Sequence, residues 1–262
     1  MWFRLLVAEI RRYLFRLWSY RVDTFGELAL WLVAYPILMV IFSSAAPTFD
    51  AEARTASLIG FLVWNLCIGA LSSITNEVAT EAREGSLEAV LLSPVPPVGL
   101  FAMRTLAFLL VQGLQTSILG LIFVFLLDAP LRLTGLAFFL LGLTVLGALG
   151  ASFALGGATI VHKQTASIVS VVSLLALLGT GALVPLNSLG PVFLWLKWLA
   201  PTAWGIDAMR AVILHGARWQ SLTADFTLLG LTVQSLALLV CGCLIFQWGV
   251  KRAQRQGALS EY

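Results

Sequence analysis

Acidic residues recur at helical spacing in the segment NEVATEAREGSLEAVLLSPVPP. Glu77, Glu81, Glu84 and Glu88 stand at i, i+4, i+7 and i+11, so a helix through this segment would carry them on one face. Like charges four residues apart destabilise an isolated helix, so intrinsic stability does not explain the stripe. An apolar patch lies beside it, formed by Leu87, Val90 and Leu91. We therefore predict an amphipathic helix over 78–92 that binds a cytoplasmic partner, with a solvated loop helix as the alternative.

The residues that could bind nucleotide or metal do not form a recognisable site. A phosphate-binding loop of the form GxxxxGK[ST] places a lysine directly after a glycine, whereas Lys163, Lys197 and Lys251 each follow another residue type. His162 and His215 lie 53 positions apart, which is not the spacing of a metal-ligand pair. We expect no catalytic residue, no cofactor site and no metal site in this chain. Nucleotide hydrolysis, if it occurs, must come from another chain.

The composition indicates a membrane protein. Of 262 residues, 60% are hydrophobic and 11% are charged, against about 25% charged in a typical soluble domain. So few charges cannot cover a soluble fold of this length, whereas the hydrocarbon of a bilayer needs no covering. The net charge is +3, but the basic residues lie mainly at the ends of apolar runs, which argues against nucleic-acid binding. We predict an all-α integral membrane protein in contact with the lipid bilayer.

A single transmembrane domain, 1–262, accounts for the pattern along the chain. Residues 2–21 combine arginines with large apolar side chains, which is typical of an amphipathic helix that lies in the membrane interface. Six apolar runs are long enough to span a bilayer, at about 24–46, 56–76, 100–127, 133–160, 165–186 and 226–249. Basic residues then fall mostly on one side, so the positive-inside bias places both termini in the cytoplasm.

The segment 190–216 holds two apolar pieces, 192–199 and 203–214, and each is too short to span a membrane. We expect them to form a re-entrant helical hairpin on the outer side, before the last span, with Pro201, Asp207 and Arg210 as its marked residues. A fused seventh span is the alternative. It would bury Lys197 and move the basic C-terminal tail to the outside, against the charge bias.

Small residues line one face of the predicted fourth span. They are Gly147, Ala151, Ala154 and Ala158. Such a stripe lets a second helix approach closely, so we predict a packing face at this position and not a ligand site.

Two stretches of the sequence resemble the ATP-binding-cassette (ABC) type-2 permeases. EAREGSLE at 81–88, followed by LLSP at 91–94, is similar to that family's E-x-E-R-E-x-G-T-L-E and L-x-x-S/T-P. The stretch 191–216 is similar to the family's P-x-W-L-x-x-I-x-x-x-N-P-L-T-Y-x-x-D-x-x-R-x-x-x-x-G. Ala82 and Ala200 depart from these patterns. The two motifs, the N-terminal helix and the six spans extend the resemblance over essentially the whole chain.

The resemblance implies the permease subunit of an ATP-driven exporter. In that family, the segment after the second span is a coupling helix that docks on a cytoplasmic ATPase subunit, and two permeases and two ATPases form the working unit. Carried over to this chain, the ATPase-binding residues would be Glu81, Arg83, Glu84, Gly85, Leu87 and Glu88. ATP and Mg²⁺ would be bound by the partner ATPase. An amphipathic small molecule, lipid or glycan would cross the inner (cytoplasmic) membrane, through a homodimer or a pair of similar permeases.

Other functional classes are weighed by the same residues. An ion-coupled secondary transporter usually places ionisable groups mid-membrane, whereas Glu27, Arg104 and Asp225 lie near span ends. A membrane serine protease would pair Ser152 with His162, but the surrounding GASF departs from the G-x-S-G pattern. A membrane anchor or sensor for an ATPase has the same fold and differs only in lacking transport.

Overall fold

A computed structural model describes residues 2–45, 51–127, 129, 131, 133–161, 171, 173, 175–177, 180–183, 200–224 and 226–256. These ranges are predominantly helical and contain no β-strand. The helices are α1 (Trp2–Ser19), α2 (Arg21–Ala45), α3 (Ala51–Arg83), α4 (Leu87–Leu91), α5 (Pro97–Leu127), α6 (Gly135–Val161), α9 (Pro201–His215), α10 (Trp219–Ala224) and α11 (Thr227–Gln256). The all-α fold class is confirmed.

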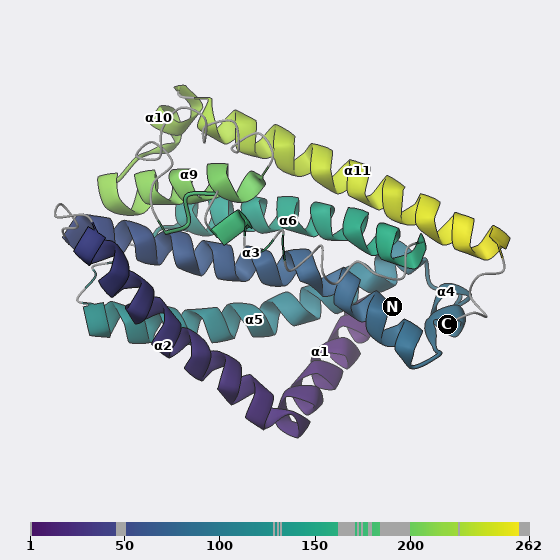
Figure 1. The fold of residues 1–262 in the computed structure, drawn as a ribbon. Coiled ribbons are helices and arrows are strands. Elements are labelled where there is room, and N and C mark those ends of the chain that lie inside the picture. The colour runs from purple at the N-terminus through teal and green to yellow at the C-terminus, as the bar shows by residue number, and fades with distance from the viewer. Residues whose placement is uncertain are drawn as a thin grey trace.

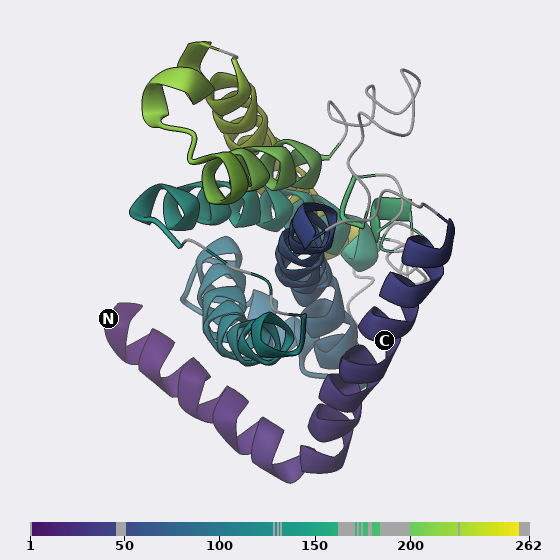
Figure 2. The same cartoon turned by 90° about the vertical axis from the view of Figure 1, so that its left-hand side faces the viewer.

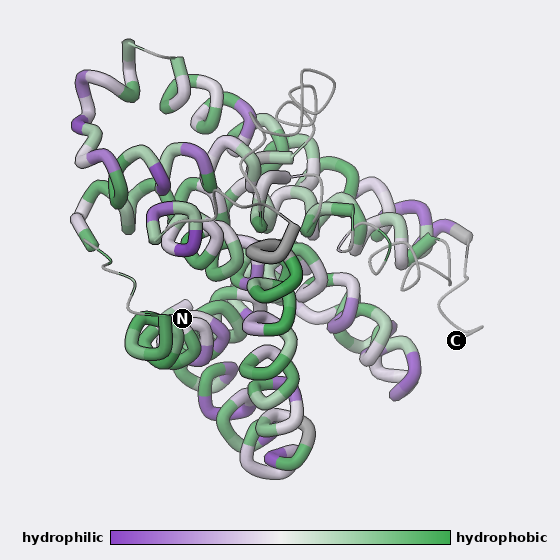
Figure 3. The backbone as a smooth tube through the Cα atoms, turned by 60° about the vertical axis from the view of Figure 1, so that its left-hand side comes forward, coloured by the Kyte–Doolittle hydropathy of each residue, from purple (hydrophilic) through white to green (hydrophobic). Residues whose placement is uncertain are grey.

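Five helices within the described residues are long and apolar enough to cross a membrane, namely α2, α3, α5, α6 and α11. Hydrophobic residues fill most of their length, as the green parts of Figure 3 show. They coincide with five of the six predicted spans. The predicted span 165–186 and the first arm of the hairpin at 190–199 lie wholly or largely outside the described residues, so the span number and the hairpin stay predictions.

α3 runs through the middle of the bundle and is buried along most of its length, with α5 packed on one side and α6 on the other (Figures 1 and 2). We call its two ends the Ala51 end and the Arg83 end. Its 33 residues make a helix roughly 50 Å long, whereas the hydrocarbon of a bilayer is about 30 Å thick. α3 therefore extends beyond the hydrocarbon, which leaves room for charged residues near the Arg83 end.

α6 and α11 pack backbone against backbone through glycines. A Cβ added to Gly242 of α11 would overlap the carbonyl oxygen of Gly150 on α6. One heptad further, a Cβ on Gly249 would lie 2.5 Å from the carbonyl oxygen of Gly157. Only glycine permits so close an approach of two helix backbones.

The closest backbone contacts of α6 with α11 are made by glycines that are not members of the stripe predicted from the sequence. Gly147 is buried, while Ala151, Ala154 and Ala158 are half-buried. The close approach is made by Gly150 and by Gly157. A methyl group at Gly150 or Gly157 would separate the backbones, so these two glycines permit the close approach of α11.

α1 and α2 diverge from a bend near Tyr20 and form a V outside the main bundle (Figures 1 and 2). α2 leaves most of its surface exposed and meets the bundle through aromatic contacts. The ring of Tyr35 is stacked on Phe61 at a centroid distance of 4.5 Å and lies 4.8 Å from Phe123. Aromatic stacking therefore fastens α2 to α3 and α5 at this point.

α9 packs against α3 and α6 at the Ala51 end, and Arg210 fixes it there. The Arg210 side chain is buried, and its Nε donates a hydrogen bond to the carbonyl oxygen of Ala56 at 2.8 Å. Its Nη2 donates to the carbonyl oxygen of Ala182 at 3.0 Å. Pro201 begins α9, and Asp207 is half-buried one turn before Arg210. The buried cation thus joins three segments that are far apart in the sequence.

The α6–α11 contact predicts that Gly242→Ala is destabilising. The new methyl group must push apart two backbones, and overpacking of this kind costs about 1–3 kcal/mol of unfolding free energy. The variant should melt several degrees below the wild type in detergent micelles. Gly142→Ala on α6 is the matched control, because its new methyl meets no atom within 4 Å and the gain in helix propensity is the same. Equal melting of the two variants would contradict the packing analysis.

Candidate functional site

The segment predicted as one helix over 78–92 is two helices joined by a turn. α3 ends at Arg83 and α4 spans Leu87–Leu91. Gly85 between them has φ 71°, in the left-handed region that favours glycine. The N–H of Ser86 donates to the carbonyl oxygen of Glu81 at 3.0 Å, and the N–H of Gly85 donates to Ala82 at 3.2 Å. This is the hydrogen-bond pattern of a Schellman motif, which ends α3, so the acidic stripe does not continue along one face.

One face of α4 is buried in the protein core, and the opposite face is exposed on the protein surface. Leu87 and Leu91 are buried in a hydrophobic cluster that includes Phe101 of α5, Phe153 of α6 and Phe246 of α11. The ring of Phe246 lies 5.4 Å, between centroids, from each of the other two rings. The residues of the turn and α4 that are exposed include Arg83, Glu84, Gly85 and Glu88. Leu87 was predicted to face an ATPase, but its side chain anchors α4 to three spans.

Glu81 is also placed differently from the prediction. It is only 5% exposed, and its Oε1 accepts a hydrogen bond from Nη1 of Arg104 at 2.6 Å. Its Oε2 accepts a hydrogen bond from the hydroxyl of Ser86. Because the carboxylate of Glu81 is buried and both of its oxygens already accept hydrogen bonds, it is not available to bind a partner protein. Glu81 instead links the end of α3 to α5 and to the turn that precedes α4.

Glu81 and Arg104 belong to a larger group of charges that joins α1, α3 and α5. Arg104 also lies 3.5 Å from Glu9 and 3.6 Å from Glu77. From α1, Arg12 and Arg16 approach Glu77 at 3.5 and 3.4 Å. We call this group the ion cluster; its members are Glu9, Arg12, Arg16, Glu77, Glu81 and Arg104. Three cations balance three anions, so the cluster is neutral in sum.

The members of the ion cluster differ in exposure. The side chains of Arg104 and Glu81 are 10% and 6% exposed, whereas that of Arg12 is 41% exposed. Exposed ion pairs contribute little to stability because solvent screens them. A buried ion pair is costly to break because the remaining partner is left without a counter-charge. Arg104 is therefore the member on which the cluster depends most.

A small cavity of about 140 Å³ lies beside the ion cluster, between α1, α3 and α5. It is lined by Tyr13, Arg16, Ser73, Asn76, Glu77, Thr80, Arg104, Thr105 and Phe108. Within the described part of the chain, Oε2 of Glu77 and Nε of Arg104 are buried without a hydrogen-bond partner. Burial, and next the charge of Glu77, raise the pKa of Tyr13 to about 12, so its hydroxyl stays neutral. The cavity is polar and large enough for water molecules that satisfy these atoms.

Sequence reasoning missed the partners in the ion cluster. It placed Glu77 and Glu81 on a docking face and Arg104 merely near a span end. A usable signal was present, because Arg104 is the one charge in the long apolar run 98–127 and needs a counter-charge. The carboxylates nearest in sequence were those of the preceding acidic segment. The contribution of Glu9 and Arg12 from α1 could not be read from spacing.

Ser152, the serine weighed for a protease, has a packing role. Its side chain is fully buried on α6, and its Oγ accepts a hydrogen bond from the N–H of Ile74 on α3 at 3.2 Å. His162 lies outside the described residues. Among the described residues, no group of three or more His, Cys, Asp or Glu side chains could hold a metal ion.

The ion cluster predicts that Arg104→Leu is strongly destabilising. The buried carboxylates of Glu77 and Glu81 and the half-buried carboxylate of Glu9 would keep only the two exposed arginines of α1, so the unfolding free energy should fall by about 3–5 kcal/mol. Arg83→Leu removes the same charge from an exposed position on α3 and should change the stability by about 0.5 kcal/mol or less. Thermal unfolding in detergent measures both. Adding Glu77→Gln to Arg104→Leu should restore part of the loss, and no recovery would argue against the network.

Comparison with known proteins identifies the family of this chain. No curated protein matches the chain. A family model described as "ABC-2 type transporter" matches residues 4–214, which run from α1, through the ion cluster and α4, to the last turn of α9. The match covers well over half of the sequence, and the helices long enough to cross a membrane make this a multi-pass membrane protein. The chain therefore belongs to the ABC-2 type transporter family, as a membrane permease of the kind that works with an ABC ATPase subunit.

Proposed function

We propose that this permease is the membrane half of an ATP-driven exporter, and that its ATPase subunit docks on the exposed face of α4 and the turn before it. One observation carries the proposal. The chain between α3 and α5 exposes Arg83, Glu84, Gly85 and Glu88, while Leu87 and Leu91 bind the same segment to the spans. A partner that pushes on the exposed face therefore acts directly on the membrane helices.

Two routes lead from α4 into the bundle. Through Leu87 and Leu91, α4 packs on the rings of Phe101 and Phe246, so a displacement of α4 reaches α5, α6 and α11. Through Ser86 and Glu81, the turn is bonded to the ion cluster, which holds α5 and α1. A helix of five residues is too short to be stable alone, so α4 keeps its shape only by these contacts.

The exposed side of α4 has a defined chemistry. Glu84 and Glu88 are exposed, while Glu77 and Glu81 are occupied by arginines of this chain. We expect the ATPase groove to present cationic or hydrogen-bond-donating side chains to these two carboxylates. ATP and Mg²⁺ would be bound by that subunit and not by this chain.

The family membership supports a proposal for the assembly and the cargo. Two permease copies, identical or similar, would enclose the transport route, with both termini in the cytoplasm and the chain in the inner membrane. Closure of two ATPases would tilt the spans through α4. The cargo would be an amphipathic small molecule, lipid or glycan.

The docking proposal predicts that the double variant Glu84→Lys/Glu88→Lys loses its ATPase. Reversal of two exposed charges should lower ATPase co-purification in mild detergent by about tenfold or more, because both contacts become repulsive. The permease itself should melt as the wild type does, since neither carboxylate belongs to the ion cluster. ATP hydrolysis in the pull-down gives a second readout.

Glu52→Lys is the matched control, because Glu52 is an exposed carboxylate at the Ala51 end of the same bundle. It should retain the ATPase in full. Equal retention by Glu84→Lys/Glu88→Lys and Glu52→Lys would show that α4 is not the docking surface. Transport by the permease alone in proteoliposomes, without any ATPase, would overturn the proposed energy source.

A further inference from the structure

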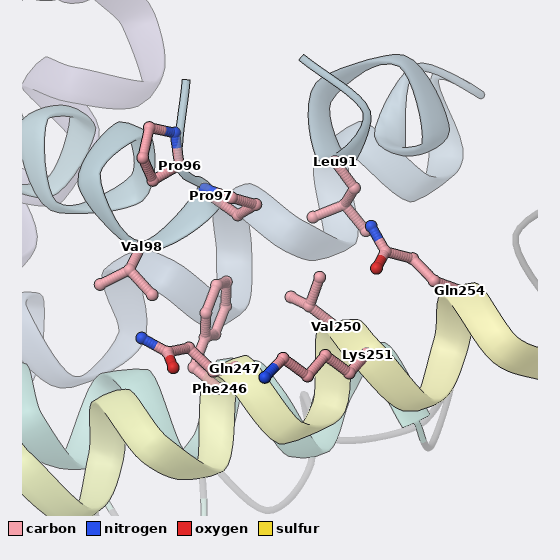
Figure 4. A pocket seen from close by; sticks show the side chains of 9 residues that line it. All are labelled: Leu91, Pro96, Pro97, Val98, Phe246, Gln247, Val250, Lys251 and Gln254. Atoms are coloured by element: carbon pink, nitrogen blue, oxygen red, sulfur yellow. The ribbon is translucent and has the colours of Figure 1, made fainter. Parts of the chain in front are cut away.

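A second hollow lies at the Arg83 end, between the C-terminal half of α11 and the start of α5 (Figure 4). Its volume is about 270 Å³. The wall from α4 and α5 is apolar and consists of Leu91, Pro96, Pro97 and Val98. The wall from α11 consists of Phe246, Gln247, Val250, Lys251 and Gln254. The pocket is therefore apolar on one side and carries polar groups along the other.

The polar groups form a short stripe on α11. Gln247, Lys251 and Gln254 stand at i, i+4 and i+7, so they share one face, and all three are exposed. Figure 4 shows them along the α11 side of the pocket. Within the described residues, Lys251 has no carboxylate at ion-pair distance. Arg104 of the ion cluster, by contrast, is paired with Glu81. A cation on a membrane helix that has no counter-ion among the described residues is suited to pair with an anion from the bilayer.

The adjacent face of α11 indicates the depth of the pocket in the bilayer. Trp248 is 56% exposed, and the guanidinium carbon of Arg252 lies 5.1 Å from the centroid of its ring. Exposed tryptophans gather at membrane–water interfaces, with arginines beside them. Gln247 and Lys251 stand at the same height of the helix as Trp248 and Arg252, because they are their chain neighbours. The pocket therefore lies at the level of the lipid headgroups.

We propose that this pocket is a binding site for one anionic phospholipid. The ammonium group of Lys251 pairs with the phosphate, and the amides of Gln247 and Gln254 donate hydrogen bonds to its oxygens. The glycerol and the first acyl carbons cover Val98 and Pro97. The volume is just below the about 300 Å³ at which pockets for whole drug-sized ligands begin, so it takes the headgroup region and leaves the tails in the bilayer.

The lipid would have a structural consequence. α11 and α5 meet here through the rings of Phe246 and Phe101, and the pocket opens beside that contact, between α11 and the α4–α5 connection. A phospholipid in the pocket would bridge the two, next to Leu91 of α4. This site needs neither an ATPase nor a cargo, so it stands apart from the proposed transport function.

The test measures lipid retention by the full chain. Wild type and variants are placed in nanodiscs with equal amounts of phosphatidylglycerol and phosphatidylcholine, released, and analysed by native mass spectrometry. Lys251→Gln should lower retained phosphatidylglycerol by about fivefold, because the phosphate in the pocket loses the ammonium group that pairs with it. Val98→Trp, which fills the pocket and keeps the charge, should have a similar effect. Arg252→Gln is the matched control, because Arg252 lies over the Trp248 ring and does not line the pocket, so this variant should retain phosphatidylglycerol within about twofold of wild type.

Each outcome decides the proposal. Selective loss of phosphatidylglycerol in Lys251→Gln and Val98→Trp, with Arg252→Gln retaining it, supports a built site. Equal loss in Lys251→Gln and Arg252→Gln means general attraction to a cationic surface, and overturns it. Unchanged retention in Lys251→Gln also overturns it. Loss of a co-purifying ATPase in Lys251→Gln, with lipid retention unchanged, would identify the pocket as a protein contact and refute the lipid site.

Discussion

A charged group cannot remain unpaired near hydrocarbon, and this constraint shapes the Arg83 end of the molecule. Arg104 stands near the start of α5 and is almost completely buried. Its guanidinium is neutralised by Glu81 and Glu77 of α3 and by Glu9 of α1. Because these carboxylates come from two different helices, pairing them also fixes where α1 and α5 lie against α3. The amphipathic helix is thereby held to the spans by charge as well as by its apolar face.

The same group of charges bears on how a signal could enter the bundle. Glu81 contacts Arg104 with one carboxylate oxygen and Ser86 with the other, so the turn before α4 is bonded to the ion cluster. Leu87 and Leu91 add an apolar attachment to the cluster of phenylalanine rings. α4 is thus held from two sides, by a polar contact and by an apolar one.

Each end of the bundle contains a buried arginine, and the two arginines have different hydrogen-bond partners. At the Ala51 end, Arg210 donates to backbone carbonyl oxygens of Ala56 and Ala182, where Arg104 at the other end binds carboxylates. Carbonyl oxygens carry only partial charge, so Arg210 joins these segments by directed hydrogen bonds, with Asp207 one turn earlier on α9 as an opposite charge that acts on it. Between the ends, Gly150 and Gly242 let α6 and α11 approach without any polar group. The contacts at the two ends of the bundle are therefore polar, and this contact between the ends is made by backbone packing alone.

The sequence by itself determined the membrane class, five of the long helices, the amphipathic first helix and the family. These depend on composition, on local periodicity and on short motifs, all of which are read along the chain. Only the tertiary structure decided that α3 ends at Arg83 before a turn at Gly85, that Glu81 pairs with Arg104, and that Gly150 and Gly157 make the close backbone approach to α11. The reason is physical: the face that a helix presents to each neighbour depends on its rotation and on which helices surround it. Those are set by contacts between residues far apart in the sequence.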